Sequence, residues 1–287
     1  MKLQNKTGWR ASPPSDKDWK YPLTSIGMAN PDIPTAASME KHVSRIDDQK
    51  RKPWCVAFGT CNAIEFQMRA RGLPVPRDGF SKAWLYARCK QLDGIPSEDG
   101  TYIKTALWVA LNEGLCPDYL CPTTEWLEKD SLPELNSIMA KEAAKYKITG
   151  FSKLQDMGGY ASLYLTKQAI ASGGFAIIAS LVEMDNWLDG DDLLLVPKGK
   201  VLGGHCTYKF GYDDKERQSD YLGFCHGANS WGEDWGSQGK YDMAYAYDNW
   251  RDSAGNPALL EAWAFSVAPP APVKRCWLCN VFRRWFR

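Results

Sequence analysis

The sequence predicts an α+β fold in which two lobes meet at a cleft. In the first half of the chain, apolar residues recur at helical spacing and each such run ends at a glycine. In the second half, short apolar runs are separated by Gly- and Asp-rich turns, which is typical of strands. A helical first half and a strand-rich second half imply two packed lobes, and clefts between lobes are favoured ligand sites.

Three helices are predicted from apolar residues spaced three or four apart. They cover residues 57–68, 85–92 and 103–110, and they stop at Gly72, Gly94 and Gly114. Four strands are predicted from the apolar runs of the second half. They cover residues 174–183, 205–214, 221–231 and 240–249.

The domain that these elements form is expected to span residues 46–267. Residues 1–45 are rich in Pro, Ser and Lys without sustained periodicity, so they read as an extended arm that could lie in the cleft. Residues 268–272 (APPAP) read as a semi-rigid spacer before a basic, aromatic C-terminal tail. On a helix, Leu278, Phe282 and Trp285 of that tail would share an apolar stripe. The stripe favours docking to a membrane surface or a partner, or packing on the chain's own domain.

Charge and composition exclude several classes of function. With 35 basic and 34 acidic residues, the chain has no electrostatic footprint for nucleic acid, and none is expected as a partner. No apolar run approaches the roughly 20 residues that cross a bilayer, and the N-terminus has no secretion signal. Nine cysteines at irregular spacing favour a reducing compartment, so we expect a cytoplasmic protein.

Cys55 is the candidate nucleophile. It begins the first predicted helix, where the helix dipole favours a thiolate, the reactive form of the side chain. A nearby base is also needed, and His205 opens a predicted strand directly after two glycines. Asn229 can accept the ring proton and orient that base, whereas His226 falls on the opposite face of its strand from Asn229.

The order and spacing of these residues resemble the papain-like (C1) cysteine peptidases. Cys55 precedes His205 by 150 residues, and His205 precedes Asn229 by 24. "NSWGEDWGSQGKY" resembles the asparagine block of that family very closely, and "GGHCTYKFGYDD" resembles its histidine strand. "Q-x5-C-x-A-F" from Gln49 resembles the nucleophile block, and "DGTYIKTALWVALNEG" from Asp99 is a weaker match to the substrate loop and its helix. In style the chain looks most like members from bacteria and their phages, so packaging in a virion is a second expected location if a phage encodes it.

The resemblance implies a papain-like fold with a helical N-terminal lobe and an antiparallel, β-barrel-like C-terminal lobe. It implies an endopeptidase that acts on peptide or protein substrates through a thioester acyl-enzyme. Cys55 would be the nucleophile, paired with His205 as thiolate and imidazolium, and Asn229 would orient His205. Gln49 would donate into the oxyanion hole, and Trp231 would cover the His205–Asn229 bond.

The resemblance also implies a substrate groove. Gly100 would line its S1 side, and Tyr102 and Ile103 would lie near the S2 pocket. Lys52 and Glu98 stand where the family commonly has a disulfide, and we expect an ion pair between them. Thr101 replaces the second glycine of a usual pair, which predicts a tighter groove wall.

Two alternative functions remain open at this stage. One is another Cys-dependent amide hydrolase or acyl transferase, and the other is a non-proteolytic structural or binding module on the same fold. No cofactor or metal is expected: Cys116 and Cys121 offer one pair only, and the acidic stretch 185–192 lacks EF-hand spacing. A solvated loop near the groove is expected for that stretch.

Overall fold

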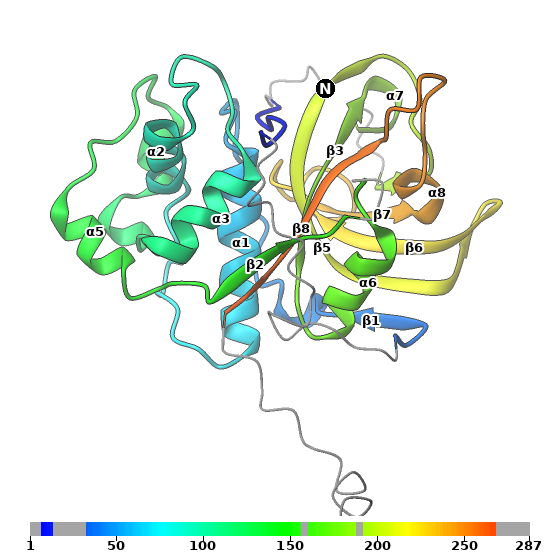
Figure 1. Cartoon of the computed structure of the whole chain (residues 1–287), viewed down its shortest axis with the longest axis horizontal. Coiled ribbons are helices and arrows are strands. Elements are labelled where there is room, and N and C mark those ends of the chain that lie inside the picture. Colours follow the sequence, from blue (N-terminus) through cyan, green and yellow to red (C-terminus); the bar gives the residue numbers. More distant parts are fainter. Residues whose placement is uncertain (1–6, 14–32, 156–159, 188–191, 268–287) are drawn as a thin grey trace, which may run out of the picture.

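The computed structural model describes residues 7–13, 33–155, 160–187 and 192–267. Figure 1 shows helices gathered on one side and strands on the other, with α1 (Cys55–Ala70) between them. The predicted α+β fold with two lobes is confirmed. Within the described ranges, no helix has the length and apolar character needed to cross a membrane.

The helical lobe contains the three predicted helices. Beside α1 these are α2 (Lys82–Leu92) and α3 (Ile103–Asn112), and the shorter elements of the lobe are η2 (Glu40–His42), η3 (Asp118–Leu120), α4 (Thr123–Leu127) and α5 (Ser137–Ala143). Every residue from 55 to 68 is buried, because α1 packs against helices on one side and against the sheet on the other. A helix that is covered all round can hold its first residue, Cys55, at the junction of the two lobes.

The sheet lobe is built on eight strands within the described ranges. Seven of them run in the order β2-β8-β3-β5-β6-β7-β4, and β1 pairs with β5 off that path. The strands are β1 (Ala36–Ser38), β2 (Gly150–Lys153), β3 (Ala176–Glu183), β4 (Leu193–Leu194), β5 (Val201–Gln218), β6 (Tyr221–Ala228), β7 (Lys240–Ala244) and β8 (Leu259–Ser266). All pairs are antiparallel except β4 with β7. Because β2 and β4 end the order without pairing to each other, the sheet is open, which corrects the barrel-like expectation.

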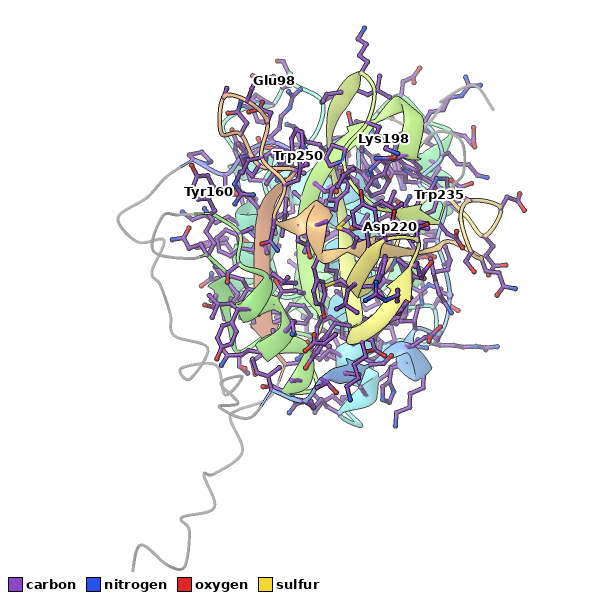
Figure 2. All side chains as sticks on the ribbon, turned by 90° about the vertical axis from the view of Figure 1, so that its right-hand side faces the viewer. Glu98, Tyr160, Lys198, Asp220, Trp235 and Trp250 are labelled. Carbon is purple, nitrogen blue, oxygen red and sulfur yellow. The ribbon has the colours of Figure 1, made fainter. Side chains whose placement is uncertain are left out.

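The four predicted strands correspond to β3, β5, β6 and β7. The last of the four predictions ran too far, because its second half forms the short helix α8 (Tyr245–Asp248). The strands β2 and β8 and the helices α6 (Leu163–Ala171) and α7 (Met184–Trp187) were not predicted. Figure 2 looks onto the sheet side of the molecule, where Trp235 and Trp250 are labelled.

Candidate active site

Cys55 lies at the first turn of α1 with no exposed surface. Burial raises the pKa of its thiol to about 11, although the nearby backbone N–H groups of Cys206, Gly8 and Val56 act in the opposite direction. The approach to Cys206 places the sulfur against β5, beside the residue that follows His205.

His205 lies on β5 and is also fully buried. Its Nε2 is 2.7 Å from Asn229 Oδ1, and its Nδ1 has no hydrogen-bond partner among the residues that the structure describes. Burial lowers the pKa of His205 to about 4, and the bond to Asn229 only partly offsets this. At neutral pH the thiol and the imidazole are therefore both uncharged. Both groups are shielded from water here, so the thiolate–imidazolium pair stays a prediction for the open groove.

Aromatic rings enclose the His205–Asn229 bond. The Trp231 ring centroid lies 4.7 Å from that of His205, as the covering role requires, and Trp187 approaches the imidazole edge-on at 5.8 Å. Trp187 is fully buried and stacks on Trp235 at 5.7 Å. The stretch 185–192 is thus not simply a solvated loop, because its tryptophan is part of the site. A tryptophan among acidic residues was the signal that could have indicated this.

Gln49 is fixed by bonds at both ends of its buried amide. Ser230 Oγ donates to Gln49 Oε1 at 2.7 Å, and Gln49 Nε2 donates to the Lys52 carbonyl at 2.6 Å. The Gln49 backbone N–H also donates to the Ser230 carbonyl. Ser230 therefore connects the asparagine block to the glutamine, a role that the sequence did not indicate.

The arm segment, which we define as residues 7–13, lies between the two lobes (Figure 1, dark blue). Its backbone runs parallel to Thr101: Arg10 N donates to the Thr101 carbonyl and Thr101 N donates to the Gly8 carbonyl, each at 3.0 Å. On the opposite wall, Trp9 N donates to the Gly204 carbonyl at 3.4 Å. The arm segment thus bridges both lobes directly over the candidate nucleophile.

The arm segment passes over the thiol at Gly8. The Cys55 thiol meets the N–H of Gly8, and the Gly8 carbonyl accepts from Thr101 N. Gly8 passes so close to the wall that a Cβ added there would lie 2.0 Å from the Pro53 carbonyl oxygen. A glycine is therefore needed at this point, where the arm segment covers the thiol.

Comparisons with known proteins bear on the fold. No protein-family model matches the chain. Its fold is similar to that of xylellain, a cysteine protease from Xylella fastidiosa, with a TM-score of 0.71 and 22% identity over 92% of this chain and 97% of that one. The chain has the papain-like fold. Procathepsin B S9 from Trypanosoma congolense (TM-score 0.67, 16% identity, covering 92% and 87%) and the bromelain protease from Ananas comosus in complex with the E64 inhibitor (0.60, 16%, 82% and 100%) are also similar.

The sequence also has a curated relative. It is an uncharacterized peptidase C1-like protein of Acanthamoeba polyphaga mimivirus, 23% identical over 177 residues, or 58% of this chain. The chain spans about half the length of that relative (54%).

The predicted groove residues of the papain-like fold divide into two groups. Gly100, at φ +87°, lines the groove, and a Cβ there would lie 2.3 Å from the Gly8 carbonyl oxygen. Ile103 is fully buried in the core between the lobes, and Tyr102 lines a surface pocket with Trp108 and Pro13. Neither of the last two side chains forms an open S2 wall in this arm-covered state.

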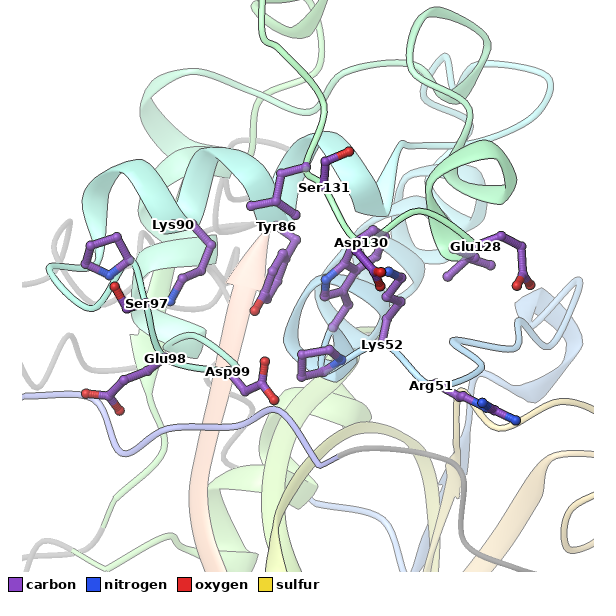
Figure 3. Close-up of a pocket in the computed structure, with 15 residues that line it drawn as sticks. Arg51, Lys52, Tyr86, Lys90, Ser97, Glu98, Asp99, Glu128, Asp130 and Ser131 are labelled. Atoms are coloured by element: carbon purple, nitrogen blue, oxygen red, sulfur yellow. The ribbon is translucent and has the colours of Figure 1, made fainter.

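The expected tightening of the wall at Thr101 stays a prediction; the Thr101 hydroxyl donates to Asp93 Oδ2 at 2.9 Å. The expected ion pair of the wall was wrong. Lys52 and Glu98 do not pair with each other, although both line one pocket of about 530 Å³ (Figure 3). Lys52 Nζ donates to the Lys129 carbonyl, and the Glu98 carboxylate lies 3.9 Å from the guanidinium of Arg10. Each residue therefore has another partner: Lys52 bonds to the backbone at Lys129, and Glu98 pairs with Arg10 of the arm segment.

Proposed function

We propose that this protein is a cysteine endopeptidase whose groove is closed by its own arm segment. The observation that supports the proposal most is that the Cys55 sulfur lies close to the backbone of Cys206, the residue after His205 on β5, while His205 Nε2 lies 2.7 Å from Asn229 Oδ1. The papain-like fold and the names of the similar proteins, which are cysteine proteases, support it.

The chemistry begins when the arm segment leaves the groove. Water and substrate then relieve the shielding that keeps both groups neutral, and the thiol proton passes to His205 Nδ1. The thiolate attacks the substrate carbonyl carbon and a C–S bond forms. The negative charge on the carbonyl oxygen is met by the Cys55 N–H and by Gln49 Nε2, and such a donor contributes roughly 2.7–4 kcal/mol to transition-state stabilisation.

The same histidine completes the reaction. His205 gives its proton to the leaving amine nitrogen as the C–N bond breaks, which leaves a thioester on Cys55. His205 then takes a proton from water, and the resulting attack releases the carboxylic acid and restores the thiol. Asn229 holds the imidazole in one orientation throughout. Trp231 and Trp187 keep water away from the His205–Asn229 hydrogen bond.

Covalent labelling with E64, the inhibitor held in the bromelain structure, tests the proposal. We expect one equivalent on Cys55 in the full chain carrying Gly8→Ala, which displaces the arm segment, and none in Cys55→Ser. His205→Ala should slow labelling by about 10²-fold or more. Peptide cleavage without transfer to added amines would then exclude an acyl transferase. Absence of labelling with the arm displaced would indicate a binding module on this fold.

Docking through the C-terminal tail is a separate proposal that the sequence alone supports. Leu278, Phe282 and Trp285 lie outside the described residues. If the tail docks, removal of residues 273–287 will change solubility or abolish a co-purifying partner. Unchanged behaviour on both counts would contradict docking.

A further inference from the structure

Glu261 is a buried carboxylate that faces the groove beneath the arm segment. Only 5% of the residue is exposed. Ser12 N donates to its Oε1 at 2.9 Å, and Oε2 accepts from Ser12 Oγ at 3.1 Å, from Trp9 Nε1 at 3.3 Å and from Trp263 Nε1 at 3.3 Å. Three of these four donors belong to the arm segment, so they leave with it.

The sheet places Glu261 level with Cys206, the residue on β5 whose backbone approaches the Cys55 sulfur. Ala179 on β3 pairs with Glu261 on one side and with Cys206 on the other. With neighbouring strands about 4.8 Å apart, the Glu261 backbone lies about 10 Å from the backbone of Cys206, whose N–H lies near the Cys55 sulfur. Next to these residues the β3–β8 register shifts, a bulge of the kind that re-aims side chains near sites.

The part of the chain that the structure describes supplies no cation to this carboxylate, because none of its Lys, Arg or His side chains lies within ion-pair distance of Glu261. Burial of an ionised carboxylate is costly unless hydrogen bonds or a positive charge compensate for it. Once the arm segment leaves, one Trp263 N–H remains. A replacement that brings a positive charge and several donors therefore gains more here than an apolar one.

We propose that Glu261 selects a basic side chain of the substrate, arginine or lysine, at the groove position that Trp9 now fills. The inference rests on the proposed peptidase function and names its substrate class. A guanidinium can donate to both carboxylate oxygens at once, as Ser12 and Trp9 now do together. Trp9 follows Gly8, the residue at the thiol, so the position that Trp9 fills lies next to the candidate nucleophile.

The test uses the full chain with Gly8→Ala and a peptide library randomised on both sides of the cleaved bond. We expect a basic preference at one position, with kcat/KM at least tenfold higher for arginine than for leucine in a matched pair of peptides. Glu261→Gln should bring this ratio near one, and Glu261→Leu should reverse it. The exposed Glu233→Gln is the matched control and should leave it unchanged. The ratio does not depend on how much enzyme is open, because both peptides compete with the same arm segment.

A second measurement leaves Glu261 intact. In the otherwise unaltered full chain, Trp9→Arg should hold the arm segment more firmly than Trp9→Leu, so that E64 labels Cys55 more slowly. An arginine-to-leucine ratio near one, or equal labelling of the two Trp9 variants, overturns the inference while cleavage and labelling leave the peptidase proposal standing. Absence of both cleavage and labelling in the Gly8→Ala chain overturns the peptidase proposal and the inference together.

Discussion

At the scale of single residues, Gln49 shows how the site is prepared before substrate arrives. Ser230 and the Lys52 carbonyl already fix the plane of its amide. In the Gly8→Ala background, Gln49→Ala should lower kcat by about 10²–10³-fold with little change in KM, because the donor acts on the transition state. Ser230→Ala should cause a smaller loss, since it removes only the orientation. Steady-state kinetics measure both variants. A change in KM as large as the change in kcat would contradict an oxyanion role.

His205 makes a prediction about pH. Its folded pKa of about 4 lies below the ordinary 6.5, because burial disfavours the charged ring. Above pH 6.5 the His205 ring is neutral in both the folded and the unfolded protein, so its titration does not reduce the free energy of unfolding there. That free energy falls between pH 6.5 and 4, where only the unfolded ring is protonated, by up to about 3 kcal/mol. Between pH 7 and pH 4, the free energy of unfolding should therefore fall further in the wild type than in His205→Gln. Denaturant unfolding at the two pH values measures both losses. Parallel losses would contradict a buried neutral ring.

Residue identity was predictable here, and charge state was not. The positions of Cys55, His205 and Asn229 follow from motif and spacing, and the structure brings His205 and Asn229 into contact. The neutral state of the thiol and imidazole depends on burial under Gly8 and Trp9, which no local pattern in the sequence encodes. The wrong Lys52–Glu98 pairing has the same origin, because the partner of each residue comes from a distant part of the chain.

At the scale of elements, the arm segment controls access to α1. A Cβ at Gly8 would lie 2.0 Å from backbone oxygen of Pro53, which cannot move aside easily. Gly8→Ala should therefore displace the arm segment and raise the rate of Cys55 alkylation by iodoacetamide at pH 5.5 by about tenfold or more, since only an activated thiol reacts there. The exposed Ala11→Ser is the control and should react like the wild type. Equal rates in all three proteins would show that the arm segment does not limit access.

Elements defined by local periodicity were predicted well, and those defined by distant partners were not. The helices α1, α2 and α3 each carry an apolar face and a glycine stop within one short stretch. By contrast, β8 was missed, although it carries Glu261, whose partner Ser12 is 249 residues away. The sequence indicated only that the arm could lie in the cleft. Its position depends on contacts with both lobes, at Thr101 and Gly204, which are distant in the sequence.

At the scale of the whole molecule, a buried ion pair fixes the strand that carries His205. Lys209 on β5 and Asp248 on α8 are both fully buried in their side chains, with Lys209 Nζ 2.5 Å from Asp248 Oδ1. Burial alone would lower the pKa of Lys209, but the Asp248 carboxylate outweighs it and raises that pKa. The pair joins β5 to α8, which packs on β6 and β7.

Removing one partner should be far more harmful than removing both. Lys209→Met leaves the Asp248 charge buried without a cation, and we expect it to lower the free energy of unfolding by about 3–5 kcal/mol. Lys209→Met with Asp248→Leu should recover most of that loss, because the two apolar side chains need no charge partner. Urea unfolding midpoints at a constant m-value measure the difference. Additive losses in the double variant would mean that the two charges do not stabilise each other, and that packing alone holds β5 in place around His205.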